Sequence, residues 1–202
     1  MKDFGFYLVI TNPVVGYARC AEAAVRAGVK IVQLRMKHAA REDILREAQE
    51  MRRVTHGTDT LFIVNDDPAL AAEAEADGVH VGQDDMPPIE VRAKFPQLKV
   101  VGLSTHNLDQ VRASWDQPID YIGVGPVYAT PTKDIPDPTL GPEMAGRMIA
   151  ASRVPAVAIG GINAETLPPV LAAGARNFAV VRAVCQSQDP YSDIRKLVEI
   201  HA

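Results

Sequence analysis

The segment LFIVNDDPALAAEAEADGVHVGQDD, Leu61–Asp85, decides the fold of this chain. A short apolar run, Leu61–Val64, ends in the polar cluster Asn65–Asp67. An alanine-rich stretch of helix length follows, and then a second apolar run that again ends in acidic residues. Short runs rich in Val and Ile are typical of strands buried on both faces. The segment therefore predicts a strand, a helix and a second strand, with Asp67 as the N-cap of the helix.

The same alternation extends over the rest of the chain. Further strand-like runs that end in polar residues are Phe6–Ile10, Ile31–Lys37, Lys99–Asn107, Asp120–Lys133, Val154–Ile162 and Asn177–Ala183. Stretches with helical spacing of apolar residues are Tyr17–Gly28, Arg41–His56, Pro68–Ala76, Pro88–Phe95, Leu108–Trp115, Pro142–Ala151, Ala164–Ala173 and Tyr191–Ile200. Gly28 and Gly57 mark the ends of the first two helices.

Eight strands alternating with eight helices predict a single compact (β/α)8 TIM barrel over residues 1–202. A doubly wound open sheet is the alternative, because it shows the same alternation. In both folds the carboxyl ends of the strands share one face, so the polar clusters should converge on one site. The long connection Tyr128–Thr139, rich in Pro, Thr and Asp, is predicted to be a mobile flap on that face.

Composition excludes several classes of protein. Of the 202 residues, 47% are hydrophobic and 23% charged, as in ordinary soluble proteins. A net charge of -4 and a pI of about 5.7 argue against a nucleic-acid surface, though not against a basic pocket for a small anion. Two distant cysteines predict a reducing compartment. Neither a signal peptide nor a membrane-spanning run is evident, so we expect a cytoplasmic protein without a membrane partner.

Basic side chains follow the second predicted strand. Gln33, Arg35 and Lys37 alternate in QLRMK, so they point the same way on an extended strand end. Arg as a planar fork and Lys as a point charge suit a diphosphate. The alternative is a salt-bridged strand end.

Acidic side chains follow the third and fourth strands. Asp66 offers one carboxylate, Asp85 offers a second with Asp84 as the less favoured alternative, and Asn65 offers an amide for a substrate. Mg²⁺ in proteins takes one or two carboxylates together with phosphate oxygens and waters. Both acidic clusters also have a structural alternative. The cluster after the third strand could be a turn in which Asp67 caps the next helix. The cluster after the fourth strand could supply an Asp N-cap to the helix that begins at Pro87 and Pro88.

The later strands are followed by hydroxyl groups, glycines and one more cation. Ser104 is placed to hold a phosphate, whereas Asn107 suits an N-cap and His80, between valines, predicts a core or lining position. The loop donors after the sixth strand are Thr130, Thr132 and Lys133, preceded by Gly123 and Gly125. Gly160 and Gly161 follow the seventh strand, where barrels often bind a phosphate; a tight turn is the alternative.

Taken together, the motifs QLRMK, FIVNDD, GVHVGQDD, GLSTHN, YIGVGPVYATPTK and AIGGI resemble those of the thiamine-phosphate synthase family, also called thiamine-phosphate pyrophosphorylases. The resemblance covers nearly the whole chain. It implies a (β/α)8 barrel that acts on small molecules. The family joins a hydroxymethylpyrimidine diphosphate to a thiazole phosphate with Mg²⁺, giving thiamine phosphate and pyrophosphate.

The resemblance also implies a set of site residues. The pyrimidine diphosphate would be held by Gln33, Arg35, Lys37, Asn65, Ser104 and Lys133. Mg²⁺ would be held by Asp66 and Asp85. The thiazole phosphate would be held by Thr130, Pro131, Thr132, Gly161, Val181 and Arg182. Four of these would act in the reaction itself, namely Lys133, Arg35, Lys37 and Ser104.

Two residues depart from the family pattern. Asn12 stands where Asp is usual, and Arg182 stands where a small Ser is usual. Arg182 would either strengthen phosphate binding or fill the pocket. Pyrophosphate loss from the pyrimidine followed by attack of the thiazole nitrogen needs no protein nucleophile, and no Ser/His or Cys/His pairing is visible in the sequence.

Two other functions stay open at this point. One is a thiazole tautomerase of similar fold, which needs no diphosphate or metal site. The other is an inactive relative that only binds a phosphate ligand. The basic and acidic clusters favour the synthase, and the oligomeric state is left open, a homo-oligomer included.

Overall fold

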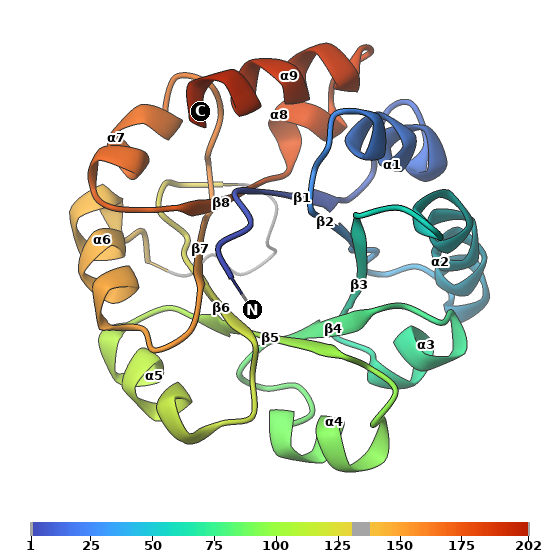
Figure 1. Cartoon of the computed structure of the whole chain (residues 1–202), viewed down its shortest axis with the longest axis horizontal. Coiled ribbons are helices and arrows are strands. Elements are labelled where there is room, and N and C mark those ends of the chain that lie inside the picture. The colour runs from blue at the N-terminus through green and yellow to red at the C-terminus, as the bar shows by residue number, and fades with distance from the viewer. Residues whose placement is uncertain (1, 131–137, 202) are drawn as a thin grey trace.

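Eight parallel strands close into a barrel in this computed structural model, which describes residues 2–130 and 138–201. The strands are β1 (Phe6–Ile10), β2 (Ile31–Leu34), β3 (Leu61–Asn65), β4 (Gly78–Val81), β5 (Val100–Thr105), β6 (Tyr121–Val124), β7 (Ala156–Ile159) and β8 (Asn177–Val180). They are hydrogen-bonded in sequence order, and β8 returns to pair with β1, Tyr7 opposite Ala179 (Figure 1). The predicted barrel is confirmed, and the open sheet is wrong because this last pairing leaves no free edge.

The helices form a ring outside the strands (Figure 1). They are α1 (Tyr17–Arg26), α2 (Arg41–Thr55), α3 (Pro68–Glu73), α4 (Pro88–Lys94), α5 (Leu108–Ala113) with a 3₁₀ turn (Ser114–Asp116), α6 (Gly141–Ala151), α7 (Leu167–Ala172), α8 (Arg182–Cys185) and α9 (Pro190–His201). The sequence did not predict α8, because four residues are too few to show a helical period. No helix within the described ranges is long and apolar enough to cross a bilayer.

Local signals in the sequence explain where several helices begin and end. The Asp67 side chain accepts a hydrogen bond from the Leu70 N–H at 2.9 Å, so it caps α3 as predicted. Asn107 caps α5 in the same way. Gly28 and Gly57 follow the ends of α1 and α2 with φ of 78° and 75°, conformations that glycine adopts without steric cost.

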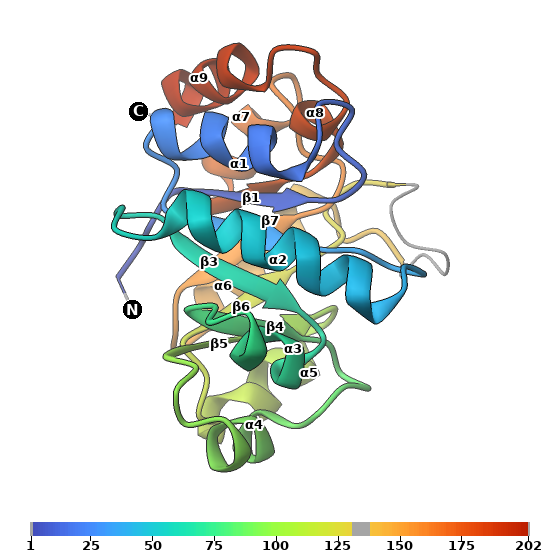
Figure 2. The same cartoon turned by 90° about the vertical axis from the view of Figure 1, so that its right-hand side faces the viewer.

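The strand side chains divide into two layers. Those that point outward pack beneath the helices and form the larger core. Those that point inward fill the barrel with a smaller cluster, formed by Tyr7, Val9, Ile31, Ile63, Val100, Tyr121, Val157 and Ala179. In the side view of Figure 2 the strand arrowheads point away from the N-terminus, toward the face that carries the long connections. Functional side chains are therefore expected on that face.

Candidate active site

A cavity of about 560 Å³ lies within the barrel and opens at the carboxyl ends of the strands. Side chains from neighbouring and opposite strands line it together. The predicted site residues among them are Gln33, Arg35, Asn65, Ser104, Thr130, Gly161, Val181 and Arg182. The structure thus brings to one place residues that are far apart in the sequence, from position 33 to position 182. Pro131, Thr132 and Lys133, with most of the predicted flap, lie outside the described residues.

A charged cluster lies just beyond the tip of β3, next to the cavity residue Asn65. Asp66 forms an ion pair with Lys37 there. Lys37 is therefore part of a salt-bridged strand end, which was the alternative role predicted for this segment. Arg35, which follows the same strand, lines the cavity.

The second predicted metal ligand, Asp85, belongs to the same cluster. Its Oδ2 accepts a hydrogen bond from the Gly82 N–H at 2.7 Å. Burial raises the pKa of Asp85; the Gly82 N–H opposes this, and the negative charge and hydrogen bonding of Asp66 add to the rise. The alternative role of Asp85 as an N-cap is wrong, since Pro87 occupies the N-cap of α4.

Two carboxylates held side by side suit a divalent cation of the hard, oxygen-binding kind. The residues described, 2–130 and 138–201, contain no group of three or more His, Cys, Asp or Glu side chains that could hold a metal. Asp66 and Asp85 would therefore fit Mg²⁺ as a partial ligand set, completed by phosphate oxygens and water. Asp66 adopts φ 64°, a left-handed conformation that is uncommon for non-glycine residues but that Asp adopts more readily than most.

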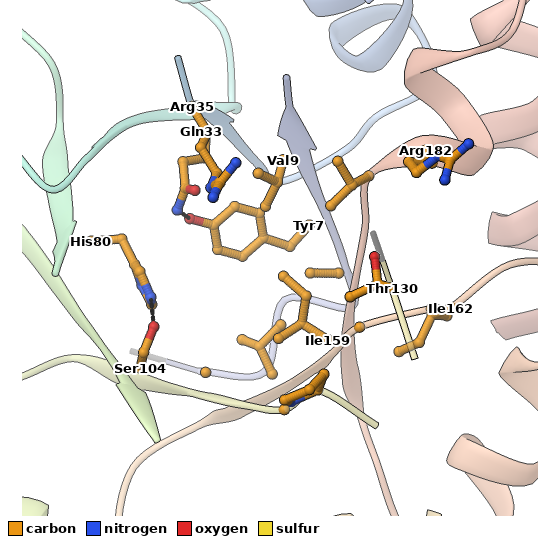
Figure 3. Close-up of a pocket in the computed structure, with 18 of the residues that line it drawn as sticks. Tyr7, Val9, Gln33, Arg35, His80, Ser104, Thr130, Ile159, Ile162 and Arg182 are labelled. Atoms are coloured by element: carbon orange, nitrogen blue, oxygen red, sulfur yellow. Dashed lines mark hydrogen bonds between the residues drawn. The ribbon is translucent and has the colours of Figure 1, made fainter. Parts of the chain in front are cut away.

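A chain of polar side chains, here called the polar floor, crosses the inside of the barrel. The Gln33 Nε2 donates to the Tyr7 hydroxyl at 2.7 Å, and the hydroxyls of Tyr7 and Tyr121 lie 2.9 Å apart. Nδ1 of His80 lies 2.9 Å from the Tyr121 hydroxyl. Its other ring nitrogen, Nε2, lies 2.9 Å from Ser104 Oγ (Figure 3). All five residues line the cavity.

The polar floor confirms one prediction about His80 and contradicts the expectation that the chain has no Ser/His pair. His80 is a lining residue as predicted, but it pairs with Ser104, so the expectation that no Ser/His pair exists is wrong. The other nitrogen of His80 contacts the Tyr121 hydroxyl, where a nucleophilic triad would have a carboxylate. Sequence reasoning missed Tyr7 and Tyr121, because an inward-facing tyrosine in an apolar strand looks like any other core residue.

Figure 3 separates two ends of the cavity. Gln33 and Arg35 lie at one end, whereas Thr130 and Arg182 lie at the other. Arg182 is exposed and is the first residue of α8. One cavity thus has an arginine at each of two separate ends, so an anionic group could be held at either end.

Gly160 and Gly161 bring two loops into close contact beside the cavity. Their φ values are 106° and 64°, and the Tyr128 N–H donates to the Gly160 carbonyl at 3.0 Å. A Cβ on Gly161 would lie 2.7 Å from the Cβ of Tyr128 and 2.9 Å from the Ala129 oxygen. The tight turn, the alternative role for these glycines, is therefore part of the explanation, since the close packing of the two loops requires them. Both glycines also line the cavity, and their role in binding a phosphate stays a prediction.

We expect Gly161→Ala to destabilise the protein by about 3 kcal/mol, from the combined cost of a left-handed alanine and of overpacking. Gly28→Ala is the matched control, because Gly28 has φ 78° and a Cβ added there would meet no other atom within 4 Å. That control should lose only about 1 kcal/mol. Urea unfolding of both variants measures the difference, and equal losses would contradict the packing role of Gly161.

Comparison with known proteins gives consistent matches. Residues 6–184 match the family model described as thiamine monophosphate synthase. The thiamine-phosphate synthase of Archaeoglobus fulgidus is 36% identical over 202 residues, covering 99% of this chain and 95% of that protein. The thiamine-phosphate synthase of Synechococcus sp. (strain WH7803) is 45% identical over 179 residues, 89% of this chain.

Coverage of the relatives differs between groups. This chain spans about half the length of the Synechococcus relatives, 50% for strain WH7803 and 54% for strain CC9605. Among solved structures, the thiamine phosphate pyrophosphorylase from Pyrococcus furiosus superimposes with a TM-score of 0.89 at 27% identity. That match covers 98% of this chain and 96% of the other.

Proposed function

This chain belongs to the thiamine monophosphate synthase family, and we propose that it makes thiamine phosphate. The substrates are 4-amino-2-methyl-5-hydroxymethylpyrimidine diphosphate and 4-methyl-5-(2-phosphooxyethyl)thiazole, or its carboxylated form. The observation that carries the proposal is the cavity itself, with a cationic group at each end and a carboxylate pair beside one of them. A thiazole tautomerase would need one anion site and no carboxylate pair.

The proposed roles follow the two ends of the cavity. The residues assigned to the pyrimidine diphosphate are Gln33, Arg35, Lys37, Asn65, Ser104 and Lys133. The residues assigned to the thiazole phosphate are Thr130, Pro131, Thr132, Gly161, Val181 and Arg182. Asp66 and Asp85 would hold Mg²⁺, which supplies positive charge to the diphosphate oxygens when it is bound.

The reaction is a substitution at the methylene carbon of the pyrimidine. The carbon–oxygen bond to the diphosphate breaks, and its electron pair leaves with the pyrophosphate. The amino-substituted ring stabilises the cation that is left, and the thiazole nitrogen then forms the new carbon–nitrogen bond. Arg35, Lys37 and Lys133 stabilise the charge that grows on the leaving group, which is the kind of electrostatic contribution that dominates such sites.

A coupling assay tests this proposal. We expect purified protein with both substrates and Mg²⁺ to form thiamine phosphate and pyrophosphate in equal amounts. A chelator should abolish the product, and added Mg²⁺ should restore it, because two carboxylates alone hold a divalent ion weakly. Folded protein that forms no product would reject the synthase, and binding of thiazole phosphate alone would then favour the inactive relative.

Arg182 offers a separate prediction for the thiazole end. Its exposed side chain at the first residue of α8 supports a role in binding over one in filling the cavity. We expect Arg182→Ser to raise the KM for thiazole phosphate by roughly 10-fold, the cost of one hydrogen bond to a charged group. The KM for the pyrimidine diphosphate should stay constant. An unchanged or lower thiazole KM would mean that Arg182 obstructs the site.

We also propose a cytoplasmic location. Two cysteines in 202 residues are too few for a disulfide framework, which supports a reducing compartment.

A further inference from the structure

The direction of each hydrogen bond in the polar floor depends on which of its groups carry a proton. Burial raises the pKa of Tyr7 and of Tyr121, so both phenols keep their proton at any working pH. Each hydroxyl in the chain therefore has one proton to donate. A neutral imidazole has one N–H donor and one acceptor nitrogen. Four contacts connect these groups in a line, from Gln33 through Tyr7, Tyr121 and His80 to Ser104.

The first contact sets the direction of the others. Because Gln33 Nε2 donates to the Tyr7 hydroxyl, the Tyr7 proton must find another acceptor. Within the described residues, the Tyr121 hydroxyl is the acceptor within reach, 2.9 Å away. The Tyr121 proton is then directed to Nδ1 of His80, which must be unprotonated to accept it.

The Tyr121 donor in turn determines the protonation of His80 and Ser104. A neutral imidazole has one ring proton. Because Nδ1 of His80 accepts a hydrogen bond, this proton is on Nε2, which lies 2.9 Å from Ser104 Oγ. His80 therefore donates to Ser104. The Ser104 hydroxyl, having accepted one hydrogen bond, keeps its own proton for a partner in the cavity that it lines.

We propose that the polar floor has a single proton direction, from Gln33 to Ser104, and that Tyr121 and His80 are positioning residues. They make the Ser104 hydroxyl a hydrogen-bond donor toward an acceptor atom of the ligand, such as a ring nitrogen of an aminopyrimidine. The identity of that ligand rests on the proposed function. If the oxygen and nitrogen of the Gln33 amide were exchanged, each hydrogen bond in the polar floor would run in the opposite direction. Ser104 would then donate to His80, and its hydroxyl could only accept a hydrogen bond from the ligand.

The surrounding packing holds this chain in place. Tyr121, Tyr7 and Gln33 are 0%, 2% and 4% exposed, so water does not compete for their hydrogen bonds. The rings of His80 and Tyr121 stack with centroids 5.4 Å apart. A Cβ on Gly102 would lie 2.2 Å from Cζ of Tyr121 and 2.5 Å from Nδ1 of His80. A glycine at this position is therefore what allows the Tyr121–His80 contact.

The tautomer of His80 tests the direction without any substrate. Two-bond ¹H–¹⁵N spectra of the unmodified protein distinguish a proton on Nε2 from one on Nδ1, and His80→Asn identifies the signal among the five histidines. We expect the Nε2–H form at neutral pH. An Nδ1–H form or an imidazolium would overturn the proposal. This result is independent of the coupling assay, so failure of the proposed function and failure of the proton direction are distinguishable.

A double-mutant cycle tests the positioning role in the active enzyme. We expect Tyr121→Phe to lower kcat/KM for the pyrimidine diphosphate by roughly 3- to 10-fold, the effect of one lost hydrogen bond. In a Ser104→Ala background the same change should have less than about a twofold effect, because Tyr121 acts through Ser104. Independent, multiplicative effects would reject the role.

Thr60→Val is the matched control for loss of a buried hydroxyl. The Thr60 hydroxyl donates to the Val29 carbonyl at 2.7 Å, just before β3 and away from the cavity. Thr60→Val should lower the free energy of unfolding measured in urea, as Tyr121→Phe should, but leave kcat/KM unchanged. If both variants lost activity equally, a merely structural role for Tyr121 would explain the data.

Discussion

Asp66→Asn is expected to lower kcat by roughly 10²- to 10³-fold, the size of effect seen when one group that stabilises transition-state charge is removed. The substitution keeps the shape of the side chain and removes its charge. Asn also tolerates the left-handed backbone that Asp66 adopts at φ 64°, so the fold should be retained. Loss of the carboxylate removes one of the two proposed ligands for Mg²⁺. Turnover at saturating substrates, titrated with Mg²⁺, measures the effect.

Asp67→Asn is the matched control, because it makes the same change one residue along the chain. Asp67 caps α3 through the Leu70 N–H, and Asn is an equally good cap. The control should retain near-normal kcat and an unchanged Mg²⁺ requirement. If Asp66→Asn retained normal turnover as well, the metal site would have to lie elsewhere and the mechanism would be wrong.

Arg35→Ala is expected to lower kcat/KM for the pyrimidine diphosphate by roughly 10- to 100-fold, since hydrogen bonds to charged groups are among the strongest in proteins. Arg35 lines the cavity at the end opposite Arg182 (Figure 3). Arg35→Lys keeps the charge but loses the planar fork, so it should restore activity only in part. Steady-state kinetics with each substrate varied in turn would show the loss on the diphosphate side.

Arg46→Ala provides the control for removal of an arginine. Its side chain is exposed on α2 and pairs with Asp43 at 2.7 Å, away from the cavity. Exposed ion pairs of this kind contribute little to stability, so the variant should behave as the unmodified protein. Equal KM values for the pyrimidine diphosphate in Arg35→Ala and Arg46→Ala would remove Arg35 from the proposed diphosphate site.

Much of the candidate site could be predicted because strand ends share one face. Gln33, Arg35 and Ser104 each follow or end an apolar run, and the barrel brings them to one cavity as the pattern indicates. Lys37 shows the limit of that reasoning. Alternation along an extended strand placed Lys37 beside Arg35, but β2 ends at Leu34, and Lys37 pairs with Asp66, the residue that follows β3.

The sequence by itself determined the strands and, apart from the short α8, the helices, because those depend on the periodicity of neighbouring residues and on caps such as Asp67 and Asn107. Only the tertiary structure decided that β8 closes on β1 and that Tyr7 meets Tyr121, 114 positions away. The physical reason is that a side chain's partner across a barrel is fixed by strand register and closure. Both depend on the packing of the whole chain, which no local pattern contains.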